Sequence, residues 1–267
     1  MRIINTTIIS LYLACFDWAK YRKTKGAVKL NLNLDGDNCI PYDAYIINGN
    51  VHDVKELQRL TKETSVIYVM DRGYVDYKFL YGIDVAGSCF VTRMKSTCAF
   101  KRVHYNPHKE QQAIVSDVLI ALTGNATKKA YPKRLWKIKY KDVETKKIYE
   151  FLTNDMEREA LEVALLYKAR GEVEVFFKWI KQHLKIKSFW GMSMNVVYSQ
   201  IWVALILTIL IWINKTIDGI KASPYELMIL MRTTLVTKNS LVALCSHTLK
   251  PKPPDFPLPT SGKTTIT

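Results

Sequence analysis

The feature that most constrains this fold is residues 161–187, a stretch with one glycine and no proline. Most of its residues favour helix, so we predict one long helix here. At 3.6 residues per turn, four side chains fall on one narrow stripe of this helix: Tyr167, Arg170, Glu174 and Lys181. The neighbouring stripe is apolar and is expected to face a core: Leu166, Val173, Phe177, Ile180 and Leu184.

Glu174 therefore lies at the rim of a core, on the same face as Arg170 and Lys181. A carboxylate in that position suits a metal ion that acts on a phosphodiester. The alternative is a solvated helix face, held together by i,i+4 pairs such as Arg170–Glu174 and Glu174–Lys178. The helix alone favours the solvated face, and the rest of the chain shifts the balance towards the metal site.

The charge balance points to a polyanionic partner. The chain has 39 Lys and Arg against 24 Asp and Glu, a net charge of +15, and the basic residues recur along most of its length. Such a field favours nucleic acid, although a generic basic surface remains an alternative. The five cysteines are odd in number and show no C-x-x-C spacing, which indicates reduced thiols in the cytoplasm and no zinc site.

Residues 196–213 carry no charge and are rich in Ile, Leu, Val and Trp. That length just reaches the threshold for a membrane span. A helix that is apolar nearly all round can also lie in the middle of a large soluble core. Ser199, Gln200 and Thr208 lower the hydropathy of the segment, so we expect a core helix and no membrane partner, within a longer helix over residues 195–217.

The first third of the chain has the pattern of a sheet with a hairpin. Residues 2–9 form a β-branched run, and residues 27–34 alternate apolar and polar side chains as a half-buried strand does. A turn then leads to a strand at residues 45–47, which we expect to pair with residues 27–34. Residues 53–61 show an acidic start and apolar positions spaced by three, which predicts a helix.

A second acidic residue follows a buried strand. Residues 66–70 are a continuous apolar run that ends at Asp71. A helix near residues 77–81 and a strand over residues 89–95 come next. Open α/β sheets place their chemistry at the carboxyl ends of such strands. The alternative for Asp71 is a helix N-cap.

Residues 96–156 change to short strands and turns, with strands expected at 114–122, 135–140 and 148–152. We interpret this part as a mainly β insertion. Trp136 lies there among several lysines and Arg134. It could stack on a nucleic acid strand, or it could pack inward while the lysines face water. The predicted divisions are 1–95 and 157–220 for the core, 96–156 for the insertion, 221–249 for a helical segment, and 250–267 for a disordered tail.

Acidic positions on strand, strand and helix, with a basic surface, suggest an RNase H-like core: an α/β mixed sheet flanked by helices. The pattern Tyr167-x-x-Arg170-x-x-x-Glu174-x-x-x-x-x-x-Lys181 matches the Y-R-E-K signature of bacterial insertion-sequence transposases of the IS-four type. The segment from Asp71 to Tyr74 is similar to the second acidic motif of that family.

The resemblance extends to residues 16–20 and 23–26, which are similar to the stretch that follows the family's first acidic motif. It covers about residues 3 to 220, and it includes a β insertion before the glutamate. It implies a DDE transposase, in which three acids hold two divalent ions, usually Mg²⁺ or else Mn²⁺, that activate water or a 3′-hydroxyl for attack on DNA.

The resemblance also implies roles and partners. Asp71 and Glu174 would be metal ligands, and Trp136 a weaker candidate for stacking on a displaced base. Tyr167, Arg170 and Lys181 would position the DNA backbone. The partners would be double-stranded DNA, as terminal inverted repeats and as target, and a second copy of the chain on that DNA. The location would be the bacterial cytoplasm, in association with the nucleoid.

One position departs from the family pattern. Counting back from residues 16–18, the first aspartate should stand at residue 5, where this chain has Asn5. An amide oxygen can touch a metal ion but brings no negative charge, so we expect little or no strand-transfer activity. Asp17 could replace the missing ligand, but it lies a dozen residues from the expected strand position.

Two further expectations follow from the resemblance. Family members usually carry an additional N-terminal segment, so the chain resembles a truncated insertion-sequence product. The alternatives to a working transposase are a non-catalytic DNA-binding remnant, an inhibitor of transposition, or a membrane protein built on residues 196–213.

Overall fold

The computed structural model describes residues 1–36, 40–51, 57, 62–107, 113–183, 186, 188–217 and 224–234. The helix predicted at residues 53–61 lies outside the described residues except for Leu57. The predicted tail at 250–267, and most of the helical segment at 221–249, also lie outside them.

The first half of the chain forms a mixed sheet around β1 (Arg2–Leu11). On one side, β1 pairs antiparallel with β3 (Lys25–Asp35), which pairs antiparallel with β4 (Pro41–Asn48). On the other side, β1 runs parallel to β5 (Ile67–Met70), which runs parallel to β6 (Cys89–Arg93). The predicted α/β class and the β3–β4 hairpin are both confirmed.

The remaining strands extend the same sheet. β10 (Ile148–Thr153) pairs antiparallel with β6, and β9 (Leu135–Lys141), β8 (Ile114–Leu122) and β7 (Phe100–Tyr105) follow outward. With the short β2 (Lys20–Arg22) beside the start of β3, the described residues form a ten-stranded sheet. Residues 96–156 are therefore mainly β, and their strands extend the sheet edge to edge, whereas their status as an insertion stays a prediction.

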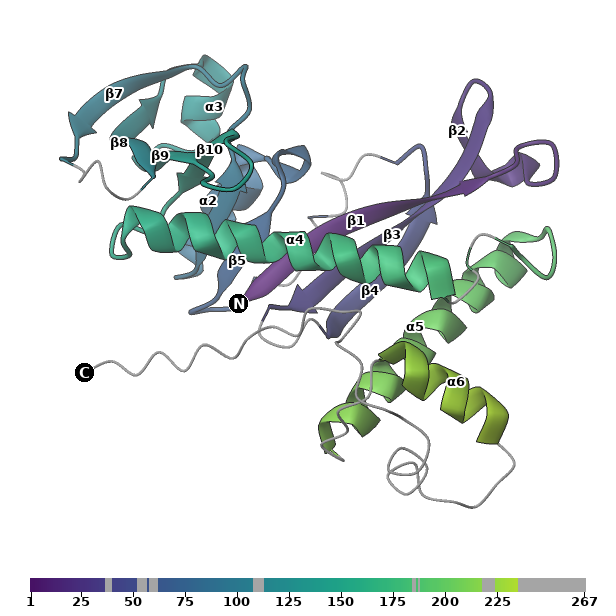
Figure 1. Cartoon of the computed structure of the whole chain (residues 1–267). Coiled ribbons are helices and arrows are strands. Elements are labelled where there is room, and N and C mark those ends of the chain that lie inside the picture. The colour runs from purple at the N-terminus through teal and green to yellow at the C-terminus, as the bar shows by residue number, and fades with distance from the viewer. Residues whose placement is uncertain are drawn as a thin grey trace.

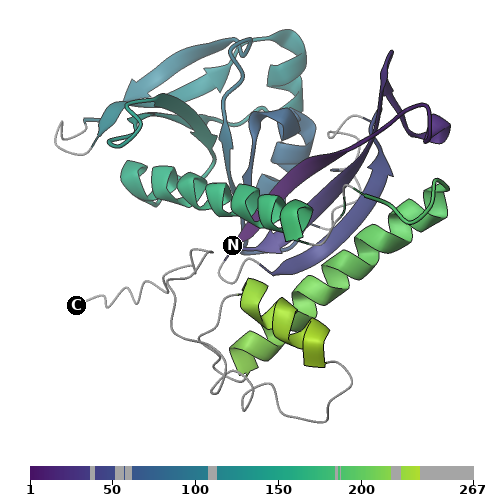
Figure 2. The same ribbon diagram turned by 45° about the vertical axis from the view of Figure 1, so that its right-hand side comes forward.

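Helices cover both faces of the sheet. α4 (Ala160–His183) crosses one face and contacts β1, β5, β6, β8 and β9, whereas α2 (Tyr77–Val85) and the short α3 (Asn125–Ala130) lie on the other (Figure 1). α5 (Met194–Ile217) begins beyond the carboxyl end of α4, and α6 (Pro224–Thr234) packs on α5 (Figure 2). The predicted long helix is confirmed. The sequence pattern did not predict β7 or α3.

Two cores result from the alternation of side chains along the strands. Ile3 and Val69 pack towards α4, together with Val91 of β6. Their neighbours Ile4 and Met70 pack on the opposite face, against α2. The sheet thus presents every second side chain of β1 and β5 to α4.

The interpretation of β3 as a half-buried strand is wrong. Its apolar side chains are buried against the α4 face, but Lys29, Asn31 and Asn33 on its other face are buried too. Two of them make polar contacts: the Lys29 ammonium donates to the carbonyl of Val51, and Asn31 accepts a hydrogen bond from the Thr6 hydroxyl. The alternating polar residues of β3 therefore form a polar layer inside the protein and do not face solvent.

α5 is apolar and long enough to cross a membrane by length and composition alone, over Met194–Lys215, and 44% of its most apolar window is buried within the fold. Core helices of soluble proteins meet the same test. One side, including Val197 and Ile201, packs into the α4 core, whereas the other, including Val203 and Ile206, is exposed. The expectation of a helix enclosed all round is wrong, because α5 lies at the edge of the described fold.

A cleft between β1, β5 and α4

The register of two strands brings Asn5 and Asp71 together. Ile4 of β1 lies opposite Met70 of β5 in a parallel pair. The residues that follow them, Asn5 and Asp71, therefore lie side by side at the end of β5. Both belong to the set that alternates with Ile4 and Met70, and they therefore point to the face that α4 covers. Adjacent strands lie about 4.8 Å apart.

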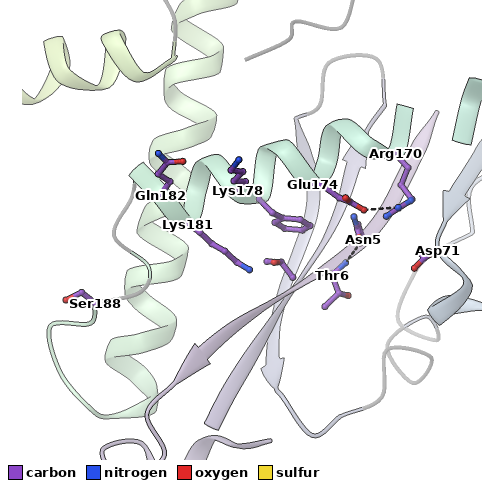
Figure 3. A pocket seen from close by; sticks show the side chains of 11 residues that line it. Asn5, Thr6, Asp71, Arg170, Glu174, Lys178, Lys181, Gln182 and Ser188 are labelled. Carbon is purple, nitrogen blue, oxygen red and sulfur yellow. Dashed lines mark hydrogen bonds and ion pairs between the residues drawn. The ribbon is translucent and has the colours of Figure 1, made fainter. Parts of the chain in front are cut away.

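Glu174 reaches the same place from α4. A cleft of about 1080 Å³ lies between this helix, the middle of β1 and the end of β5. Figure 3 shows Glu174 above Asn5, with Asp71 beyond them on the same side of the sheet. The lining residues are Asn5, Thr6, Thr7, Asp71, Arg170, Glu174, Phe177, Lys178, Lys181, Gln182 and Ser188. The three positions expected to carry acids thus line one cleft.

Asp71 is held by Tyr167. The Tyr167 hydroxyl donates to Oδ1 of Asp71 at 2.9 Å, and the tyrosine ring is buried against Phe151. Burial is the main cause that raises the pKa of Tyr167, and the nearby carboxylate of Asp71 raises it further. The phenol therefore stays protonated at neutral pH. Its observed partner is the carboxylate, which differs from the phosphate contact expected from the sequence.

Glu174 is paired within the helix. Nη2 of Arg170 donates to Oε1 of Glu174 at 2.8 Å, and the Arg170 side chain is 13% exposed while that of Glu174 is 62% exposed. Burial alone would lower the pKa of Arg170, but the neighbouring groups Tyr167, Glu174 and Asp71 raise it above its ordinary value. Nε of Arg170 is buried and has no hydrogen-bond partner among the described residues. The i,i+4 pair expected for a solvated face is present, but its arginine is buried.

Lys181 joins α4 to β1. Its ammonium donates to the carbonyl of Ile8 at 2.7 Å, about two turns along the helix from Glu174. Lys178 and Gln182 also line the cleft and were not proposed as site residues. Their positions four and eight residues after Glu174, on the same helix face, were the available signal for them. Ser188 carried no signal, because it reaches the cleft from the segment after α4.

The amide of Asn5 is largely buried and tied to its own strand. Its Oδ1 accepts a hydrogen bond from the backbone N–H of Thr6 at 2.9 Å. The Thr6 hydroxyl in turn contacts Asn31 and the hydroxyl of Tyr74. A polar network thus fixes the end of the cleft floor next to Asp71.

Two other candidates lie elsewhere. Trp136 is 6% exposed, and its indole N–H donates to the carboxylate of Asp117. It packs inward, as the alternative interpretation expected, so base stacking by Trp136 is not possible in this structure. Asp17 is exposed in a 3-10 turn beyond the end of β1 and does not line the cleft.

The donor set fits a hard divalent ion by type but is short of charge. Carboxylate and amide oxygens are the ligands that Mg²⁺ and Mn²⁺ prefer. Within the described residues, no group of three or more His, Cys, Asp or Glu side chains is placed to hold a metal ion. Asp71 and Glu174 together carry a charge of about −2 at neutral pH, which balances one dication.

Comparison with known proteins agrees with this geometry. Residues 7–210 match a family model described as a transposase DDE domain. Over 225 residues, 82% of this chain and 62% of the relative, the chain is 33% identical to a Sinorhizobium fredii protein named as the transposase y4zB. Over 213 residues, 79% of this chain and 55% of the relative, it is 26% identical to a Geobacillus stearothermophilus protein named as a transposase for the insertion sequence element IS5377.

The chain spans 62% and 55% of the lengths of these two curated relatives. The family match runs from the middle of β1 through most of α5, so it covers the strands and the helix that form the cleft, apart from the first residues of β1. The mixed sheet flanked by helices agrees with the RNase H-like fold expected for such a domain. The chain therefore belongs to the transposase DDE domain family.

Proposed function

We propose that this chain acts on insertion-sequence DNA as a transposase of the IS-four type, by metal-dependent phosphodiester cleavage and strand transfer. The observation that carries the proposal is the convergence of Asn5, Asp71 and Glu174, from β1, β5 and α4, on one cleft. The substrates would be the terminal inverted repeats and the target DNA. A homodimer on DNA and association with the nucleoid are part of the same proposal.

Each cleft residue has a role in this proposal. Asp71 and Glu174 would hold a divalent ion, Mg²⁺ or Mn²⁺, which when bound makes water or a 3′-hydroxyl a better nucleophile. Arg170 and Lys181 would position the DNA backbone, because their charges face the cleft beside the carboxylates. Tyr167 would orient Asp71 through its hydrogen bond and would not contact the phosphate.

With Asn5 in place of an acid, the chain is proposed to have only weak strand-transfer activity. Two dications carry +4, whereas the two carboxylates of the cleft supply about −2. Asn5 contributes an oxygen but no charge, so binding of a second ion would be strongly disfavoured. We expect little or no strand transfer until an acid stands at position 5.

The test is an Asn5→Asp variant. We expect it to cleave Mg²⁺-dependently a DNA duplex that carries the terminal repeat of the element, at least ~100-fold faster than the original chain, because it gains a third carboxylate. The matched control is the double variant Asn5→Asp/Glu174→Gln, which keeps the new acid but loses another. An Asn5→Asp protein that cuts no better than the original chain would overturn the proposed role of position 5.

A second candidate function is that of a non-catalytic DNA-binding remnant or an inhibitor of transposition. Asn5 favours it, as does the lack of a three-acid group among the described residues. Such a protein would bind DNA with a steep salt dependence. As the original chain it would not cut terminal-repeat DNA with Mg²⁺ or Mn²⁺, so metal-dependent cleavage by the original chain separates the two functions.

A further inference from the structure

A short hairpin carries the densest positive charge in the described part of the chain outside the cleft. Residues 20–25, called here the basic hairpin, comprise β2 and the start of β3 and hold four cations in six positions. All four are exposed, and none forms an ion pair with a described residue: Lys20, Arg22, Lys23 and Lys25. Figure 1 shows the hairpin projecting beyond the rest of the sheet, on the side where α5 begins.

The basic hairpin is firmly anchored at its base. The indole N–H of Trp18 donates to the carbonyl of Met192 at 2.8 Å, and the Trp18 ring meets the ring of Tyr198 edge to face at 6.0 Å. The rings of Phe16 and Phe189 pack in the same manner, also at 6.0 Å. These contacts tie the segment before the hairpin to the connection between α4 and α5. The backbone that carries the four cations is therefore anchored to the rest of the fold.

The cleft leads to this hairpin. Its lining runs along α4 from Glu174 past Lys178 and Lys181 to Ser188, which directly precedes Phe189. Along the floor, β1 runs from Asn5 to Leu11, a distance of roughly 20 Å at about 3.3 Å per residue. The hairpin lies next to the far end of this strand, since Leu11 is opposite Gly26, the residue that follows the hairpin. A basic track thus connects the two carboxylates with the hairpin.

An exposed aromatic residue stands beside the hairpin. Trp190 is 82% exposed, although its backbone N–H is fixed by the side chain of Gln200. It lies between Phe189 and Met192, the two residues that contact Phe16 and Trp18. A large exposed aromatic side chain, on a segment that contacts the base of a basic hairpin, is typical of surfaces that bind nucleic acid.

From these observations we propose that the basic hairpin and Trp190 grip the backbone of duplex DNA where it leaves the cleft. The proposal rests on the proposed function, because it assumes that the cleft receives DNA. Ordered cations without anionic partners favour phosphates, and their release of counterions makes binding depend on salt. The roughly 20 Å along β1 places the contact about six base pairs from the phosphate in the cleft, at about 3.4 Å per pair.

The test compares two charge variants of equal size. The first is Lys20→Gln/Arg22→Gln/Lys23→Gln/Lys25→Gln, in the basic hairpin. The control is Lys101→Gln/Arg102→Gln/Lys128→Gln/Lys129→Gln, which also removes three lysines and one arginine, from exposed positions on the edge strand β7 and on α3. Binding to a 30-base-pair duplex with the element's terminal repeat is measured by fluorescence anisotropy across a range of KCl, with EDTA present so that no cleavage occurs.

We expect the slope of log K against log[KCl] to fall by about 3 to 4 in the hairpin variant, since each lost phosphate contact removes about 0.9. The control should change the slope by less than about 1, and a Trp190→Ala variant should weaken binding without changing the slope. Hydroxyl-radical footprinting should show protection about six base pairs from the cleavage point, and the hairpin variant should lose it.

The outcomes separate this inference from the function on which it rests. An equal fall of the slope in the hairpin and control variants, or an unchanged slope in the hairpin variant, would overturn the proposed DNA contact of the hairpin. Either result would leave the proposed function standing. An original chain that does not bind the duplex would overturn both. Unfolding of the variants is checked by thermal denaturation, and unchanged midpoints are expected because all eight positions are exposed.

Discussion

At the scale of single residues, the chemistry of the cleft depends on one hydrogen bond as much as on its acids. The buried Tyr167 hydroxyl donates to Oδ1 of Asp71, and Phe151 packs against the tyrosine ring at 4.8 Å. The bond fixes one oxygen of the carboxylate and leaves its orientation little freedom. Groups that orient a metal ligand in this way strongly affect metal affinity. In the proposed function, Tyr167 is therefore a positioning residue for Asp71.

We predict that Tyr167→Phe weakens Mn²⁺ binding about 10- to 100-fold, the usual effect of losing such a supporting contact. The ring remains, so its packing on Phe151 is kept. Because the pKa of Tyr167 is raised by burial, its hydroxyl stays a donor below pH 10. The ratio of the Mn²⁺ affinity of the original chain to that of Tyr167→Phe should therefore stay constant from pH 6 to pH 9. Tyr149→Phe, on β10, is the matched control and should bind Mn²⁺ as the original chain does. A ratio of one would contradict the role of Tyr167.

At the scale of elements, the sequence predicts what depends on local pattern. The helix-forming composition of residues 161–187 predicted the long helix, and the apolar run before Asp71 predicted β5. The register that sets Asn5 beside Asp71 was not predictable, because it arises from pairing between segments far apart in the chain. The burial of Trp136 also depends on a distant residue, Asp117. Pattern identified the elements, and long-range pairing decided which residues meet.

α5 offers a test with two identical residues on one helix. Ile201 is fully buried in the α4 core, whereas Ile206 is 54% exposed. We expect Ile201→Ala to lower the free energy of unfolding by about 2–5 kcal/mol, and Ile206→Ala by less than about 1 kcal/mol. Urea denaturation of the purified protein measures both. Equal losses at the two positions would contradict the packing of α5 described here.

At the scale of the whole molecule, charge and architecture agree. A net charge of +15 surrounds a cleft in which two carboxylates face three cations, Arg170, Lys178 and Lys181. The positive surface suits the DNA polyanion, and the carboxylates suit a divalent ion. The sequence predicted the positive surface and the two carboxylates. It did not predict the polar layer on one face of β3 or the extension of the sheet by β7. The polar layer depends on burial between layers and β7 on pairing with β8, and no local pattern encodes either.

The most direct test of a metal ion shared by Asp71 and Glu174 is a Mn²⁺ titration followed by electron paramagnetic resonance. It compares the original chain with Asp71→Asn, Glu174→Gln and Asn5→Asp. Because all three positions line one cleft, we predict that either acid-to-amide variant weakens Mn²⁺ binding at least ~10-fold and that Asn5→Asp strengthens it. Unchanged affinity in both Asp71→Asn and Glu174→Gln would contradict the claim that these residues share a metal ion.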